Sequence, residues 1–334
     1  MIKEQPIKTL FSTAITSSIL VCLMILLTSC DAETNEPVDS QRHSHQWIQA
    51  AALSSDGTRA IVSQTPHVAT LWDLSNNAIL LYLNHSPLKS QGIRHIMLSH
   101  QGDYSLVTTD HHLIFWNLHT GQPLGIHHLG HKIVAVDLEK NGSRALIALD
   151  NHTILYMNMM NGQVIWRWSH NGDIKDVNLS QDGQYAVTGA DDRSVKLWDT
   201  NTGQMLHQWD HEKSVSTVAI SPHSRFVVST DNYRYLYVWD LMTGKRIHAL
   251  AIPPMNVSGV VFSPDERYLA ISCTPQILQL WHMDSGALKK QWILPKIKFW
   301  KPTSIKVHDM VFTPNNRYLL TEDSLGFHHK WLTH

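Results

Sequence analysis

The chain has 334 residues, of which 43% are hydrophobic and 16% are charged, so it is long enough to bury a sizeable core. Its formal net charge of −1 argues against a nucleic-acid-binding protein, which would need a basic face. Its three cysteines provide neither a disulfide framework nor a zinc-type Cys/His spacing, and GxGxxG, P-loop, GxSxG and HExxH motifs are all absent. Composition and motifs therefore predict no catalytic residues, no cofactor and no metal.

The first predicted element is a targeting segment, residues 1–29. Its apolar run, 19–27, is too short to cross a bilayer comfortably, since a spanning helix takes about 20 apolar residues. The run leads into Leu-Thr-Ser-Cys at 27–30, which resembles the lipobox of bacterial lipoproteins. That resemblance implies cleavage before Cys30 and diacylation of this cysteine, so that the mature chain is tethered to a membrane. The alternative is an uncleaved anchor helix over about 11–29.

Residues 30–45 follow the signal as a polar, acidic stretch without apolar periodicity, which predicts a flexible tether. Asp31 directly follows the cysteine that would carry the lipid. In the lipoproteins that the signal resembles, an Asp at this place commonly favours retention in the inner membrane. We therefore expect a lipid-anchored protein that faces the periplasm of a Gram-negative-type bacterium, at the inner rather than the outer membrane.

Residues 46–334 repeat themselves seven times. One aligned position recurs with spacings of 44, 41, 41, 41, 42 and 50 residues. It is occupied by Trp72, Trp116, Met157, Trp198, Trp239, Trp281 and Trp331. Each copy contains alternating apolar runs separated by turns with Gly, Asn, Asp or Pro, which is the pattern of short antiparallel strands. Four such strands fit into about 41 residues.

The copies resemble the WD-repeat β-propeller family, most clearly in DDRSVKLWDTNTGQML at 191–206. The resemblance implies an all-β fold, a seven-bladed β-propeller of four-stranded antiparallel blades built from degenerate WD repeats. The expected blade cores are 48–83, 93–129, 132–168, 173–209, 214–250, 257–292 and 305–334. The last copy lacks a fourth strand. Residues near 36–46 could supply it and close the ring, because an incomplete ring would expose a sheet edge.

The family's stabilising network joins a His, a Ser or Thr, an Asp and the repeated Trp. The resemblance assigns this structural tetrad completely in the fourth copy, to His170, Thr188, Asp192 and Trp198. The second copy offers a set with small gaps in the alignment, namely His85, Thr108, Asp110 and Trp116. The fifth copy has Tyr233 where the Asp belongs, and the third has lost the Trp. A fully satisfied buried network of this kind would fix the geometry of a blade.

Several recurring side chains have both a structural and a functional interpretation. Four loop histidines are expected on one face, where we interpret them as surface residues rather than as ligands of one metal ion: His67, His111, His112 and His152. Three first-strand acids could line the central channel, as an enzyme would require: Asp137, Asp176 and Asp309. Three fourth-strand tryptophans are expected to pack between blades: Trp168, Trp209 and Trp292.

The longest gap between copies contains LPKIKFWKPTSIK at 294–306. It interleaves cationic with aromatic side chains at Lys296, Lys298, Phe299, Trp300 and Lys301. Aromatic residues with basic neighbours suit a protein interface, so this segment is the candidate interaction loop. The alternatives are that the aromatic residues plug the ring closure, or that the loop contacts anionic lipid headgroups.

We therefore expect a non-enzymatic, membrane-tethered, monomeric propeller that acts as a protein–protein interaction scaffold on the periplasmic side. Its expected associations are with unknown protein partners and, through lipidated Cys30, with the membrane. One alternative is an accessory subunit of an envelope assembly complex, because residues 161–168 resemble quinoprotein-type lipoprotein propellers. Another is a cofactor-binding or hydrolytic propeller enzyme. The sequence names neither the partner nor the pathway.

Overall fold

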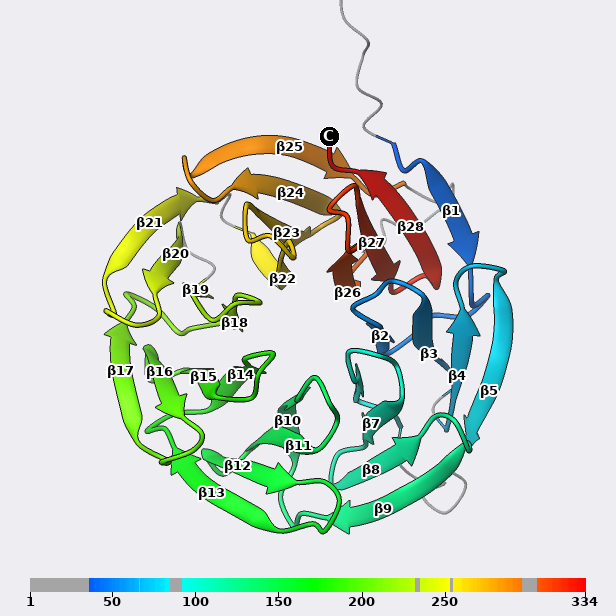
Figure 1. The fold of residues 1–334 in the computed structure, drawn as a ribbon, viewed down its shortest axis with the longest axis horizontal. Coiled ribbons are helices and arrows are strands. Elements are labelled where there is room, and N and C mark those ends of the chain that lie inside the picture. Colours follow the sequence, from blue (N-terminus) through cyan, green and yellow to red (C-terminus); the bar gives the residue numbers. More distant parts are fainter. Residues whose placement is uncertain (1–35, 66, 85–91, 232–234, 253–254, 296–304) are drawn as a thin grey trace, which may run out of the picture. The chain divides into compact units, whose positions relative to one another are not determined.

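The computed structural model describes residues 36–65, 67–84, 92–231, 235–252, 255–295 and 305–334. Every regular element within these ranges is a β-strand. The strands form seven antiparallel sheets of four strands each, and Figure 1 shows the sheets arranged as blades around a common axis. The predicted fold class, an all-β seven-bladed propeller with four-stranded blades, is confirmed.

The strands of a blade follow one another from the axis outwards (Figure 1). Blade 1 contains β2 (Ala51–Leu53), β3 (Arg59–Thr65), β4 (Val68–Asp73) and β5 (Ala78–Asn84). Blade 2 contains β6 (His95–Leu98), β7 (Tyr104–Thr108), β8 (His112–Asn117) and β9 (Gln122–His128). Blade 3 contains β10 (Ile133–Leu138), β11 (Arg144–Leu149), β12 (Thr153–Asn158) and β13 (Val164–Ser169). Blade 4 contains β14 (Ile174–Leu179), β15 (Tyr185–Ala190), β16 (Ser194–Asp199) and β17 (Met205–Asp210).

The remaining blades have the same plan. Blade 5 contains β18 (Thr217–Ile220), β19 (Phe226–Thr230), β20 (Tyr235–Asp240) and β21 (Arg246–Ala251). Blade 6 contains β22 (Asn256–Phe262), β23 (Tyr268–Thr274), β24 (Ile277–His282) and β25 (Ala287–Ile293). Blade 7 contains β26 (Val307–Phe312), β27 (Tyr318–Asp323) and β28 (Phe327–Leu332), and its fourth strand is β1 (Asp39–Arg42).

Blade 7 joins the first and the last described strands of the chain in one sheet. β1 pairs antiparallel with β28, with Ser40 opposite His329 and Gln41 opposite His328. The Ser40 hydroxyl also lies 2.7 Å from His329 Nδ1. β1 therefore supplies the strand that the last repeat lacks, and the ring closes by hydrogen bonding rather than by packing alone.

A recurring turn joins the first two strands of a blade. In blade 4, the Ser180 hydroxyl donates to Asp182 Oδ1 (2.6 Å) and accepts the backbone N–H of Tyr185 (2.9 Å). Gly183 lies between them at a φ of +69°, the left-handed region that glycine enters without steric cost. The equivalent serine-to-aspartate bond, from Ser263 in blade 6, is also 2.6 Å. The Ser-x-Asp pattern in the sequence thus builds the hairpins.

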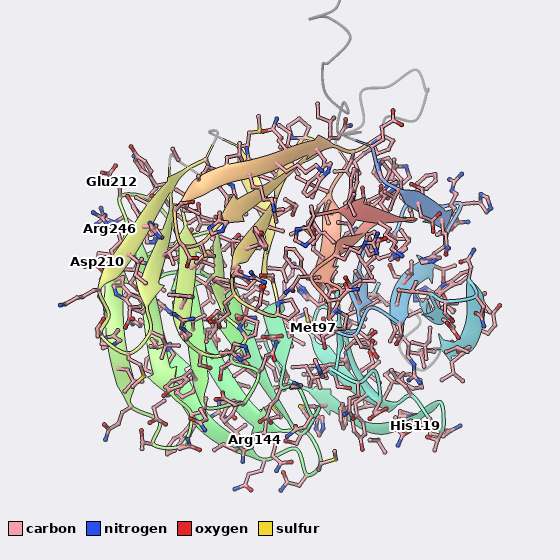
Figure 2. The ribbon with its side chains drawn as sticks, turned by 45° about the horizontal axis from the view of Figure 1, so that its top comes forward. Met97, His119, Arg144, Asp210, Glu212 and Arg246 are labelled. Atoms are coloured by element: carbon pink, nitrogen blue, oxygen red, sulfur yellow. The ribbon has the colours of Figure 1, made fainter. Side chains whose placement is uncertain are left out.

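The hydrophobic core is divided among the seams between neighbouring blades. One cluster contains Trp209 of blade 4 and Trp239 of blade 5, and another contains Trp292 of blade 6 and Trp331 of blade 7. Side chains fill the space between the strands, whereas Arg246 of β21 lies at the rim (Figure 2). Each blade therefore buries its two faces against its neighbours.

Candidate protein-binding site

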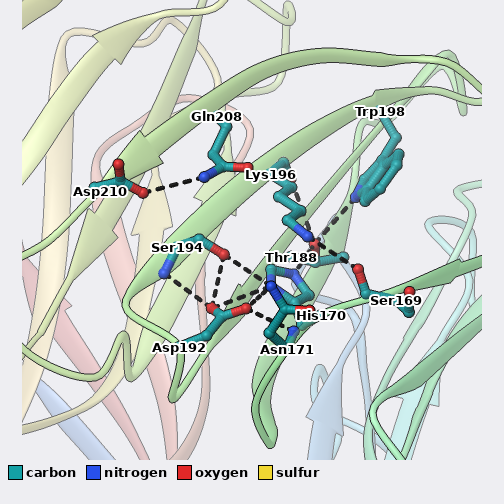
Figure 3. Close-up of polar contacts among 10 residues, drawn as sticks. All are labelled: Ser169, His170, Asn171, Thr188, Asp192, Ser194, Lys196, Trp198, Gln208 and Asp210. Atoms are coloured by element: carbon teal, nitrogen blue, oxygen red, sulfur yellow. Dashed lines mark hydrogen bonds and ion pairs between the residues drawn. The ribbon is translucent and has the colours of Figure 1, made fainter.

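Blade 4 brings the four residues of the structural tetrad together (Figure 3). His170 Nε2 lies 2.8 Å from Thr188 Oγ1, and the Trp198 indole N–H donates to the same oxygen at 3.1 Å. His170 Nδ1 lies 3.2 Å from Asp192 Oδ2. Ser194 also belongs to this network, since its hydroxyl donates to Asp192 at 2.7 Å and lies 2.9 Å from His170 Nδ1. The sequence pattern did not include it.

Burial and hydrogen bonding together determine the charge state of this network. It lowers the pKa of His170 to about 4, against the opposing attraction of Asp192. Burial would raise the pKa of Asp192, but hydrogen bonds from Ser194 and from the Asn171 N–H, together with His170, lower it to about 2. At neutral pH the pair is therefore a carboxylate and a neutral imidazole. With the proton on His170 Nδ1, the hydrogen bonds form a chain: the Trp198 N–H donates to the Thr188 hydroxyl, the Thr188 hydroxyl donates to His170 Nε2, and His170 Nδ1–H donates to Asp192.

Blade 5 has an acid in its network, although the sequence alignment placed Tyr233 there. Asp231 Oδ2 lies 3.7 Å from His211 Nδ1, and the Asp231 side chain is 6% exposed. His211 Nε2 lies 2.8 Å from Ser229 Oγ, which also accepts the Trp239 N–H at 2.8 Å. Asp231 follows the hydroxyl residue by two positions instead of four, which is why the alignment missed it. Tyr233 lies outside the described residues.

The set assigned to blade 2 is wrong at its hydroxyl. Strand register places Val107, not Thr108, at the position that Thr188 has in blade 4. The Thr108 hydroxyl instead accepts a backbone N–H of the first strand at 3.2 Å. Asp110 forms an ion pair with Arg94, with 2.9 Å between their closest atoms. His85 lies outside the described residues.

Two blades without the hydroxyl supply another acceptor to their tryptophan. The Trp72 N–H donates to Thr70 at 2.9 Å, and the Trp281 N–H donates to Gln279 at 3.3 Å. Both acceptors lie two residues before the Trp, on the same strand. A buried indole N–H needs a partner, so this position compensates when the network is incomplete.

The fourth-strand tryptophans seal the seams between blades. The Trp168 ring stacks on Trp198 of the next blade, with centroids 5.0 Å apart, and Trp209 stacks on Trp239 at 5.2 Å. The Trp168 N–H also donates to Gly203 O at 2.9 Å. Gly203 has a φ of +73°, and a Cβ there would come within 2.8 Å of a neighbouring indole. These tryptophans are therefore committed to packing.

Three first-strand acids hold neighbouring inner strands together. Each accepts a backbone N–H from the next blade: Asp137 from Leu179 at 2.7 Å, Asp176 from Val218 at 2.9 Å and Asp309 from Leu53 at 2.7 Å. Each also accepts the N–H of the residue that follows it, at 2.8 or 2.9 Å. Burial raises their pKa values to about 6, 7 and 7, although these hydrogen bonds oppose the shift. These contacts assign them a structural role in the channel wall.

The ring closure contains a buried carboxylate between two histidines. Glu322 Oε1 lies 2.8 Å from His43 Nδ1 and 3.0 Å from His328 Nδ1. Burial would raise the pKa of Glu322, but the bonds from His328 and His43 lower it to about 2. The His43 ring also stacks on Trp72 of blade 1, at 4.7 Å. The segment between β1 and β2 is thus fixed to both blades that it connects.

The turns between first and second strands surround a cavity of about 390 Å³. All seven blades contribute to its lining, for example with Ser55, His100, Lys140, Gln181, His223, Phe262 and Phe312. Its outer lining carries the exposed side chains of Lys140, Gln181 and His223, whereas Phe262 and Phe312 are buried. We call this cavity the channel mouth. Its volume lies within the range of about 300–1,000 Å³ that is typical of binding pockets.

Two predicted sites lie outside the described residues. They are the lipid-anchor residue Cys30 and the interaction loop with Lys296, Lys298, Phe299, Trp300 and Lys301. On both sides of that loop the chain is fixed in the core, since Leu294 and Ile305 are each 1% exposed. In the described part of the chain, no helix has the length and apolarity to cross a membrane. The same residues, the four loop histidines included, contain no group of three side chains placed to hold a metal ion.

Comparison with known proteins supports the interpretation of the repeats. The family model "WD domain, G-beta repeat" matches residues 162–199 and 203–240. No curated protein matches the chain. The first range runs from just before β13, the fourth strand of blade 3, to the end of β16 in blade 4. The second runs from just before β17, the fourth strand of blade 4, to the end of β20 in blade 5. In blades 4 and 5, described residues place a His, a hydroxyl and the Trp in direct contact. The chain is thus a seven-bladed β-propeller that contains WD40 repeats.

Proposed function

We propose that the protein is a non-enzymatic, membrane-tethered propeller that binds protein partners on the periplasmic side. The observation that carries the binding part of this proposal is the channel mouth, a cavity of about 390 Å³ to which all seven blades contribute. WD40 propellers commonly act as protein-interaction scaffolds. Their rigid ring holds many loops in fixed positions, so binding surfaces arise by loop variation without loss of the fold.

The chemistry of the channel mouth suits a polypeptide partner. Ile220 and Phe262 supply apolar surface in the lining, while Lys140, Gln181 and His223 are exposed around it. Protein interfaces commonly combine a desolvated apolar centre with a polar rim. A partner can therefore insert one or two apolar side chains at the centre and place hydrogen-bonding groups over the rim.

Site-specific photo-crosslinking tests this proposal. A crosslinkable amino acid replaces Gln181 or His223 in the full chain. The control position is Arg246 of β21, at the outer edge of the propeller and away from the channel mouth (Figure 2). We expect the two mouth positions to capture the same partner in cells, identified by mass spectrometry, and the control position to capture none of it. Equal capture at Arg246, or no discrete product at the mouth, would contradict the proposal.

The proposed tether is lipidated Cys30, with Asp31 favouring the inner membrane. The lipobox-like sequence at 27–30 supports this part of the proposal. Wild-type chain is expected to incorporate labelled palmitate and to fractionate with the inner membrane, whereas Cys30→Ala is expected to do neither. Incorporation into the Cys30→Ala variant would contradict lipidation at this residue.

The loop with Phe299 and Trp300 is proposed as a second contact surface for the same partner. Its interleaved aromatic and basic residues support this assignment. The double variant Phe299→Ala, Trp300→Ala is expected to reduce partner recovery while the thermal unfolding midpoint stays unchanged. Lost stability with full partner recovery would instead show that these residues plug the ring closure.

A further inference from the structure

The seam between blades 2 and 3 lacks the pair of tryptophans that seals the seam between blades 3 and 4. Strand register places His127 of β9 at the position that Trp168 has in β13. It places Met157 of β12 at the position that Trp198 has in β16. Both replacements have a smaller side chain than tryptophan. These smaller side chains predict unfilled volume at the seam between blades 2 and 3.

A groove of about 520 Å³ lies at this seam. Its lining includes Leu149, Leu155 and Met157, which are buried side chains of blade 3. His127 lines it from blade 2, and Val164 lines it from the outer strand of blade 3. We call this the seam groove. It lies where the two missing indoles would stand, so a planar aromatic group is the natural shape to fill it.

The seam groove favours an aromatic group chemically as well as by shape. Met157 carries a polarisable thioether that makes favourable contacts with aromatic rings. Its three rotatable side-chain bonds also let this part of the groove adapt to a guest. His127 adds a ring against which an aromatic side chain can stack. An inserted indole would therefore restore the kind of contact that Trp168 and Trp198 make at the next seam.

The polar side chains of the seam groove favour an acidic ligand. Arg167, His128 and His131 are exposed residues of its lining. The Arg167 guanidinium forms no ion pair with any residue that the structure describes. No described Asp or Glu lines the groove, and Asp150, which is 3.4 Å from His131, lies outside the lining. A carboxylate beside the aromatic group can thus pair with the Arg167 guanidinium, and the lining itself contains no described acidic residue.

We infer that the seam groove binds an aromatic side chain, tryptophan above all, within an acidic segment of a protein partner. The inference rests on the proposed function and specifies the chemistry of the partner. The channel mouth and the seam groove are lined by different residues, so each can be disabled separately.

Peptide binding to the full-length chain in detergent tests this inference. The probe is a fluorescein-labelled peptide, GDEWEDG, with binding followed by fluorescence anisotropy. Its two controls are GDEAEDG, which lacks the aromatic group, and GKKWKKG, which reverses the charge. We expect both controls to bind at least about tenfold more weakly than the probe, since each lacks half of the recognised chemistry.

Four variants of the protein complete the test. Met157→Trp fills the groove with the residue that six of the seven repeats carry, and it is expected to weaken probe binding at least about tenfold. Arg167→Ala is expected to weaken it about tenfold through the lost charge-assisted contact. The matched controls Met160→Trp, in the same blade, and Arg246→Ala, at the rim, lie outside the groove lining and are expected to bind normally.

Thermal unfolding of each variant shows that it is folded. Unchanged probe binding by folded Met157→Trp would overturn the inference, as would equal binding of GKKWKKG and GDEWEDG. The channel-mouth crosslink separates the two proposals. If it persists while no variant affects peptide binding, the groove inference fails and the proposed function stands. If the crosslink is absent, the proposed function fails whatever the peptide result.

Discussion

The two seams of blade 3 are built differently, although the same repeat generates both. Towards blade 4, the Trp168 and Trp198 rings stack at 5.0 Å, and the Trp198 N–H is held by Thr188. Towards blade 2, His127 and Met157 take the corresponding positions beside a groove of about 520 Å³. Both seams nevertheless join regular four-stranded blades. A blade therefore keeps its fold when one of its seams is not sealed by tryptophan.

In blade 3 the hydroxyl and the indole of the network are absent together, whereas blades 1 and 6 lack the hydroxyl and keep the indole. In blade 3, strand register places buried Ile147 at the hydroxyl position of Thr188, and Met157 replaces the indole. Replacing both hydrogen-bonding partners leaves no buried donor without an acceptor, which makes the loss inexpensive. His131 and Asp150 remain 3.4 Å apart, but their side chains are about half exposed. The freed seam can then vary without penalty to the fold.

The largest effect on the free energy of unfolding is expected when the indole is removed from the seam between blades 3 and 4, which we call the sealed seam. Trp198→Ala should cost about 3–5 kcal/mol, because it leaves a cavity against Trp168 and removes a buried aromatic ring. At the seam between blades 2 and 3, which we call the open seam, the volume-conserving change Met157→Leu should cost less than about 1.5 kcal/mol. Urea unfolding followed by circular dichroism measures both free energies of unfolding. Similar costs for the two variants would contradict the contrast between the seams.

The hydroxyl position should show a smaller difference. Thr188→Val keeps the shape of the side chain but removes the acceptor of the Trp198 N–H and the partner of His170 Nε2. Two buried polar atoms without partners should cost about 2–4 kcal/mol. The matched change in blade 3, Ile147→Val, affects no hydrogen bond and should cost about 0.5–1.5 kcal/mol. A Thr188→Val cost no larger than that of Ile147→Val would show that the network contributes nothing to stability.

The sealed seam should also be sensitive to acid. The pKa of His170 is about 4 in the folded chain and about 6.5 when unfolded, so between these values the unfolded chain binds more protons. The contribution of His170 to the free energy of unfolding is therefore complete above pH 6.5 and is lost as the pH falls towards 4. The raised pKa values of Asp137, Asp176 and Asp309 act in the opposite direction, but they are common to wild type and variant.

Comparing wild type with His170→Asn isolates the histidine contribution. The wild-type free energy of unfolding should fall more steeply below pH 6.5, by up to about 1.4 kcal/mol per pH unit. Urea unfolding at several pH values between 4 and 7 measures the two slopes. Parallel curves for wild type and His170→Asn would refute this assignment.

The repeated tryptophan made the fold predictable, because a period of about 41 residues with strand-like alternation fits one blade. The tetrad of blade 4 was predictable for the same reason, since its four residues keep the family spacing. Asp231 was missed because it follows the hydroxyl residue by two positions instead of four. Thr108 was misassigned because side chains in a strand alternate between faces. A shift of one residue in alignment therefore exchanges a network residue for one that points away. The sequence alone does not fix that register.

The channel mouth and the seam groove could not be predicted from sequence. Ser55 and Phe312 lie at opposite ends of the propeller sequence and meet in one lining only because the ring closes. The loss of the indole at Met157 was visible in the repeat. Its consequence depends on His127, which belongs to the preceding blade and is brought opposite by packing. Both sites arise between repeats, whereas sequence comparison reads within them.

The smallest effect on stability is expected when the seam between blades 2 and 3 is given back its indole. Met157→Trp restores the repeated residue next to a groove of about 520 Å³. Filling a cavity commonly stabilises a protein by about 0.5–2 kcal/mol. Here Ile147 stands at the hydroxyl position and offers the new indole N–H no acceptor, so we expect a gain near the lower limit.

Adding Ile147→Thr supplies the missing acceptor. The double variant should therefore be more stable than the sum of the two single changes predicts, as measured by a double-mutant cycle in urea. Met160→Trp, on the surface of the same blade, should leave stability within about 0.5 kcal/mol of wild type. Strictly additive single changes would mean that the hydroxyl and the indole contribute to stability independently, and would contradict the expected coupling.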